Sequence, residues 1–292
     1  MAAATSPGFT TKRGLKVRAP KLAFEGTSKR WMANSRAATH IANGVNLLFP
    51  AGERFFIRSV RHYLDRITPE LAAEVRGFFG QEGRHAYAHE RFFDTLRAQG
   101  YDIDSILRRY ERVAYDGIEK VSPAVLCLSV TVALEHFTAI LAEDALSTDE
   151  LGHADTEVRR LMEWHAVEEL EHKAVAFDVL KQVAPGYGIR VAGMVFATIV
   201  LSGFWLFATR ELLAQDGSSL REAARELEEL RKEAERLAKE SGRQTALAQP
   251  IATGVFLRGI REYLRPGFHP NDRDHRALIA STLERLNREG VV

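Results

Sequence analysis

Apolar residues recur along most of the chain at the three- and four-residue spacing of helices, whereas the alternation typical of strands is scarce. Proline and glycine fall mostly between the periodic segments, where they begin or end helices. The pattern predicts helices over residues 28–46, 50–63, 69–100, 103–119, 123–145, a segment after Ser147 that contains 164–181, and 274–287. We therefore expect an all-α fold.

The composition changes after residue 185. Residues 191–209 are nineteen residues without a charge, between Arg190 and Arg210. A heavily charged helical stretch follows over 219–243, and then a shorter apolar piece over 250–257. Because about 20 apolar residues span a bilayer as a helix, three interpretations of 191–209 stay open. They are a helix that is buried or at a homodimer interface, a peripheral membrane contact assisted by 250–257, and a true span.

These shifts predict three regions: an N-terminal arm over 1–27, a helical bundle over 28–184, and a helical C-terminal extension over 185–292. The 40 basic and 39 acidic residues nearly cancel, so no global field indicates nucleic acid. The one cysteine, Cys127, lies in an apolar run and fits a buried thiol in a reducing compartment. The N-terminus lacks the apolar core of a secretory signal, so we expect a cytoplasmic protein, with the inner face of the cytoplasmic membrane as its other location.

Two lone glutamates alternate with two Glu-x-x-His pairs along the predicted helices: Glu53, Glu82 with His85, Glu135, and Glu169 with His172. Residues three, four and seven apart share one face of a helix. His89 therefore extends the stripe of the first pair and His165 that of the second, and we predict both as further metal ligands. A four-helix bundle holds two metal ions with this order of donors, one Glu from each of two helices and a Glu-x-x-His from each of the others.

Each piece alone has a plainer interpretation, because a single Glu-x-x-His is more often a solvated charged face. The combination, its order and its apolar setting favour a dinuclear metal site. Glu135 in particular is the only charged residue between 121 and 141, and an unpaired carboxylate there would be costly. Carboxylate and imidazole donors without a second cysteine suit two iron ions, with manganese as the alternative. We expect Glu168 and Glu171 to point elsewhere or to orient the imidazoles.

The pattern resembles the ferritin-like diiron carboxylate superfamily, and the variant His165-x-x-x-Glu169-x-x-His172 is similar to that of the aminobenzoate N-oxygenases. The resemblance implies six shared ligands and His165 as an additional one. His89 lies outside that pattern. From about Trp31 onward the chain also resembles a bacterial family described as predicted metal-dependent hydrolases, through FPAGERFFIRSVR (49–61), FFGQEGRHAYAHERF (78–92), ALEHFTAIL (133–141), WHAVEELEHKAVAFDV (164–179) and RPGFHP (265–270).

We first expect an oxidase or oxygenase that activates dioxygen as co-substrate, draws on an external electron donor, and acts on a small or lipid-like organic molecule. The alternative is a metal-dependent hydrolase in which the two ions activate water. A third interpretation is a metal-binding bundle without catalysis.

Overall fold

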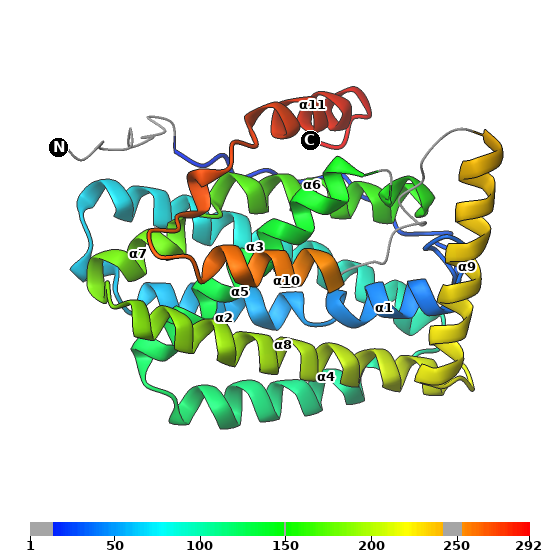
Figure 1. The fold of residues 1–292 in the computed structure, drawn as a ribbon, viewed down its shortest axis with the longest axis horizontal. Helices are drawn as coiled ribbons and strands as arrows, with labels where there is room; N and C mark the ends of the chain where they lie inside the picture. Colours follow the sequence, from blue (N-terminus) through cyan, green and yellow to red (C-terminus); the bar gives the residue numbers. More distant parts are fainter. Residues whose placement is uncertain (1–13, 149, 242–252) are drawn as a thin grey trace.

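The computed structural model describes residues 14–148, 150–241 and 253–292 (Figure 1). Within these ranges the chain is helical, and its one β-type pairing is an isolated bridge between Met32 and Ala154. The predicted all-α fold is confirmed. The α-helices are α1 (Arg36–Asn46), α2 (Phe49–Arg61), α3 (Pro69–Ala98), α4 (Ile103–Glu111), α5 (Ala124–Ser147), α6 (Thr156–His172), α7 (Val175–Val183), α8 (Tyr187–Gln215), α9 (Leu220–Ser241), α10 (Thr253–Tyr263) and α11 (Arg276–Arg288).

Four of these helices enclose a common interior. Helix α2 packs on α3, α5 packs on α6, and the two pairs meet through contacts of α2 with α5 and of α3 with α6. Large side chains such as Phe78, Phe92, Phe137 and Trp164 fill this interior and are fully buried. Each of the four helices contributes at least one predicted metal ligand, so the packing brings all the ligand-bearing faces together.

An outer layer covers this core. Helix α8 packs against α1 and α5, α10 packs on α5, and α11 packs on α6 (Figure 1). The described part of the N-terminal arm runs over the surface without regular structure, and its Leu22 and Phe24 are buried in the core.

Three helix boundaries differ from the sequence-based expectation. The first helix begins at Arg36, because Ala33 and Asn34 adopt positive φ and Ser35 caps the helix by accepting from the Ala38 amide. The segment 103–119 is an α-helix only to Glu111 and continues as a π-helix, η2 (Arg112–Glu119). The helix with Trp164 ends at His172, and two residues separate it from α7.

Within the residues that the structure describes, two helices are long and apolar enough to cross a membrane, which by itself is weak evidence for a membrane protein. Helix α5 is 61% buried over its apolar window and α8 only 22%. The interpretation of 191–209 as a buried helix therefore holds for one face of α8 and not for the other. Of the apolar piece 250–257, residues 250–252 lie outside the described residues and the rest begins α10.

Candidate metal centre

The predicted ligands converge at the centre of the four helices. Glu53 comes from α2, Glu82 and His85 from α3, Glu135 from α5, and His165, Glu169 and His172 from α6. All seven are buried. The one-turn spacing on α3 and α6 points each Glu-x-x-His pair to the same side, toward the single glutamates of α2 and α5.

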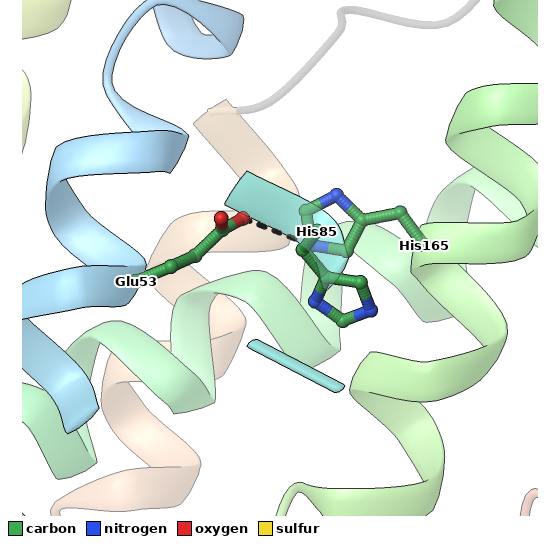
Figure 2. A group of neighbouring side chains, drawn as sticks. All are labelled: Glu53, His85 and His165. Atoms are coloured by element: carbon green, nitrogen blue, oxygen red, sulfur yellow. Dashed lines mark ion pairs between the residues drawn. The ribbon is translucent and has the colours of Figure 1, made fainter. Parts of the chain in front are cut away.

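The donor atoms form three overlapping groups, in each of which they lie within 4.8 Å of one another. The first joins Glu53, His85 and His165, and Figure 2 shows these three side chains turned toward one another. The second group is Glu82, His85 and Glu169, and the third is Glu82, Glu135 and His172. Because His85 and Glu82 are shared, the groups form one continuous site with room for two neighbouring ions.

Glu169 lies between the two ends of this site. Its Oε1 is 2.8 Å from His165 Nε2 and 3.6 Å from His85 Nδ1, whereas its Oε2 is 3.6 Å from His172 Nε2. At the second end, His172 Nε2 is 3.1 Å from Glu82 Oε1 and 3.5 Å from Glu135 Oε2. Glu169 therefore reaches donor atoms at both ends of the site and would contribute an oxygen to a metal ion at either end.

The site also passes a test of fit for cations. Both carboxylate oxygens of Glu53, Glu82 and Glu135 are buried and make no hydrogen bond of acceptable geometry, and the same holds for Glu169 Oε2, His85 Nδ1 and His172 Nε2. Buried polar atoms are nearly always satisfied, so this many orphaned donor atoms in one place calls for a ligand. Four carboxylates with neutral imidazoles balance the charge of two divalent cations.

The pKa values reflect this crowding of negative charge. Burial raises the pKa of Glu53 and of Glu135 well above the usual value, and the nearby Glu82 carboxylate adds to both shifts. Burial likewise raises the pKa of Glu82 to about 7. Burial lowers the pKa of His172, but the carboxylates of Glu169, Glu82 and Glu135 together raise it more, so the net direction is upward. Burial lowers the pKa of His85, which keeps that imidazole neutral.

Each of the three histidines holds its outer ring nitrogen against a fixed partner. His85 Nε2 lies 3.1 Å from Glu168 Oε2, and His172 Nδ1 lies 3.0 Å from Gln81 Oε1. His165 Nδ1 lies 2.7 Å from His89 Nε2. Such contacts fix the ring orientation and tautomer of metal-binding histidines.

His89 belongs to none of the three groups, although we predicted it as a ligand. Its Nε2 contacts His165 and its Nδ1 contacts Asn46 Oδ1. When His89 Nδ1 donates to Asn46 Oδ1, its Nε2 accepts from His165 Nδ1, and the lone pair of His165 Nε2 is left facing the carboxylates. The structure therefore places His89 behind His165 rather than at the site.

Further partners were missed or left open by the sequence. Arg18 in the N-terminal arm binds Glu168 at 3.1 Å and Glu171 at 2.7 Å, and Gln81 Nε2 donates to Glu171. Nothing in the sequence signals the roles of Arg18 and Gln81. Glu168 thus contacts the His85 imidazole directly, and Glu171 reaches the His172 imidazole through Gln81, in agreement with the expectation that they orient the imidazoles.

An apolar pocket meets one end of the site. Its interior volume is about 100 Å³, or about 1000 Å³ when the space open to solvent is included, and Glu53, His165 and Glu169 form part of its wall. Phenylalanine and aliphatic side chains from α2, α5 and α8 form most of the rest, with Tyr110 and Tyr115 on the α4–η2 side. No lysine or arginine is among the described residues that line it. The pocket suits an apolar, uncharged molecule placed directly against the donor atoms.

Residues 16–274 match the model of a protein family described as predicted metal-dependent hydrolase. The match covers most of the chain, so the protein belongs to this family. No curated protein matches the chain, and no solved structure does. The family description, together with the buried donor groups, supports metal dependence and favours the hydrolase alternative over the dioxygen-dependent reaction that we expected first. The ferritin-like diiron assignment stays a prediction.

Proposed function

We propose that this member of the predicted metal-dependent hydrolase family is a dinuclear metal enzyme that hydrolyses an uncharged, apolar substrate. The observation that carries the proposal is the contact between the orphaned donors and the apolar pocket: Glu53, His165 and Glu169 belong to both. A substrate in this pocket has its reactive group beside the metal centre and its apolar body against the phenylalanines.

The seven donors named above would hold two divalent ions. Bound ions of this kind polarise a carbonyl and lower the pKa of a water molecule. The chain itself supplies the geometry. Glu168, His89 and Gln81 hold the three imidazoles, and the apolar wall excludes bulk water from the reacting group. Because no cationic side chain lines the pocket within the described residues, we favour a neutral ester or amide over a phosphoester.

Oxidation by dioxygen is the second candidate, and the donor set is the observation that favours it. Four carboxylates and three imidazoles, with no thiolate, match the preferences of iron and manganese. Hydrolysis would use a redox-inert ion equally well, whereas oxidation requires iron or manganese and an electron donor. The identity of the metal therefore separates the two reactions.

The test begins with the metal content of protein purified without added metal, measured by elemental analysis. Metal-free protein is then reloaded with zinc or with ferrous iron, and hydrolysis of neutral esters of increasing chain length is assayed without oxygen. Turnover with zinc under these conditions supports the hydrolase. Oxygen consumption with reduced iron, and no ester turnover with either ion, would overturn it in favour of the oxidase.

Glu135→Ala removes one donor and should abolish two-metal binding and turnover together. Glu90→Ala, an exposed glutamate on α3 that pairs with Arg54, is the matched control and should change neither. If both variants retain metal and activity, the proposed centre is wrong. If metal binds stoichiometrically but neither reaction occurs, the non-catalytic interpretation replaces the enzyme.

A further inference from the structure

Helix α8 presents a continuous apolar face to the outside. Over the uncharged run 191–209, its large exposed side chains are Val195, Ile199 and Leu206, which are 53%, 67% and 55% exposed. Ala192 is exposed one turn before Val195, and Ser202 and Gly203 are exposed between Ile199 and Leu206, so the outward stripe recurs at helical spacing and carries no charge. Three large apolar side chains on one uncharged stripe of a helix are unusual for a surface that meets only water.

The opposite face of α8 packs against the rest of the protein. Gly193 approaches the backbone of Ser129 on α5, and Trp205 Nε1 donates to the Ile41 carbonyl of α1 at 2.8 Å. Arg190, at the start of the apolar run, is buried and donates to the carbonyl of Arg265. A helix that is held in this way along its length cannot cross a bilayer alone. It can lie on a bilayer only with its exposed face turned toward the lipid.

Arginines flank the apolar stripe on both neighbouring elements. On one side, exposed Arg109 and Arg112 belong to α4 and η2, and α4 contacts α8 (Figure 1). On the other side, exposed Arg258 and Arg261 belong to α10, whose Phe256 ring lies 5.9 Å from that of Trp205 on α8.

Arg210 continues the α8 stripe at its end and shares the carboxylate of Glu211 with Arg109, so one acidic group faces two basic ones. An apolar stripe with basic borders matches the acyl and phosphate zones of an anionic bilayer surface.

The same helix separates this face from the substrate pocket. Phe196, Val200, Leu201 and Phe204 of α8 line the pocket, and they alternate with the exposed residues of the stripe. Ile118, Glu119 and Ser122 of the pocket lining are partly buried, as are the lining residues of α8, and the adjoining Val121 is 83% exposed. The apolar interior of the pocket and the apolar outer face are thus one helix apart.

We propose that the protein docks peripherally on an anionic lipid bilayer through the outer face of α8 and the arginines of α4, η2 and α10. We infer further that the pocket receives its apolar substrate from that bilayer, a step that rests on the function proposed above. A second copy of the chain is the competing occupant. A two-fold contact along α8 would bring the flanking arginines of the two copies to the same interface, and like charges oppose that arrangement.

The docking is tested by sedimentation of the full chain with vesicles of phosphatidylglycerol mixed with phosphatidylcholine, and with vesicles of phosphatidylcholine alone. We expect binding to the anionic vesicles that weakens with added salt. The triple variant Val195→Asp, Ile199→Asp and Leu206→Asp changes only exposed side chains, and it should weaken binding by about 100-fold, since each substitution removes apolar contact and adds like charge. Arg258→Glu with Arg261→Glu should lower binding to the anionic vesicles by at least about tenfold.

The matched control is Val17→Asp, Tyr87→Asp and Leu237→Asp, which changes three exposed apolar residues away from α8 and should leave vesicle binding unchanged. The proposal is overturned if the wild-type protein binds neither kind of vesicle. So does a wild-type dimer, seen by analytical ultracentrifugation, that the α8 variant converts to a monomer without any vesicle binding.

Metal content and turnover of a soluble short-chain ester are measured on the same samples. Vesicle binding by a protein that binds no metal would contradict the proposed function but support the membrane-docking surface. Metal binding and ester turnover without vesicle binding would support the proposed function but contradict the docking surface. For substrate delivery, the α8 variant should keep its rate on the soluble ester and lose rate only on an ester embedded in vesicles. Equal rates of wild type and variant on the embedded ester overturn the delivery step.

Discussion

Burial raises the pKa of the Glu53, Glu82 and Glu135 carboxyls, in the case of Glu82 to about 7, so protons compete with cations for these side chains. Burial lowers the pKa of His172, but the carboxylates of Glu169, Glu82 and Glu135 together raise it, and the net direction is upward. A metal ion must displace these protons. Below a raised pKa the proton competes with the metal, so we expect affinity to fall as the pH drops through about 7.

Calorimetric titration of metal into metal-free protein, in buffers with different ionisation enthalpies, gives the number of protons released. We expect at least about two per chain at neutral pH, because the carboxyls and His172 titrate in the same direction. Metal binding that releases no proton and does not depend on pH would contradict this account of the site.

Gln81 tests whether the partners of the imidazoles matter. Its side chain joins His172 Nδ1 to Glu171, and both contacts are made away from the metal donors. Gln81→Leu keeps the approximate shape and removes the acceptor, so we expect metal affinity to fall by about 10- to 100-fold. Competition with a chelator of known affinity measures it. Gln99→Leu, just after the end of the same helix, is the control, and an equal loss in both variants would assign the effect to general destabilisation.

The sequence could propose the candidate ligands because donor type and one-turn spacing are local properties, and the structure brings seven of them together. It did not predict which histidine is a ligand and which is a partner. His89 and His165 each extend a Glu-x-x-His stripe by one turn, but only the packing of α1, α3 and α6 sets His89 between Asn46 and His165. Gln81 and Arg18 were missed for the same reason, since their contacts join residues about ninety and one hundred and fifty positions apart.

At the level of the helices, the contact between α5 and α8 depends on a glycine. A Cβ added at Gly193 would lie 2.5 Å from the Ser129 carbonyl oxygen, and backbone cannot move aside as a side chain can. Gly193→Ala should therefore destabilise the fold by about 1–3 kcal/mol. Gly203 lies on the same helix with nothing within 4 Å of its added Cβ, so Gly203→Ala should be neutral or stabilise by up to about 1 kcal/mol. Urea denaturation compares the two, and equal effects would argue against the close contact.

The presence of each helix could be predicted from periodicity, whereas the misplaced helix boundaries have causes that periodicity does not show. Ala33 and Asn34 adopt positive φ, which apolar spacing does not reveal. The helix with Trp164 breaks after His172, where the Lys173 ammonium donates to the Arg273 carbonyl, a contact with a segment one hundred residues away. The π-turns of η2 widen the helix beside the pocket, and the residue types of 112–119 do not predict them.

At the scale of the whole molecule, composition indicated an apolar helix over 191–209 but not which of its faces is covered. That depends on α1 and α5, whose packing against α8 joins segments far apart in the sequence. The same packing places α8 beside the pocket, so one helix serves both the interior and the outer surface. The domain boundaries at 28 and 185 stay predictions.

Metal and fold stability should be coupled, because the ions bind a site that exists only when the four helices are packed. Ligand present at about 1,000 times its dissociation constant stabilises the folded state by about 4 kcal/mol. We expect chelation to lower the melting temperature and added metal to restore it, as followed by calorimetry. Glu135→Leu supplies the control: it removes a buried carboxylate that is costly without a cation, so the variant should melt at a temperature that metal no longer changes, at or above that of the metal-free wild type. If a chelator does not change the melting temperature of the wild-type protein, the buried glutamates are accommodated by protonation. The centre then does not bind metal tightly in the folded chain.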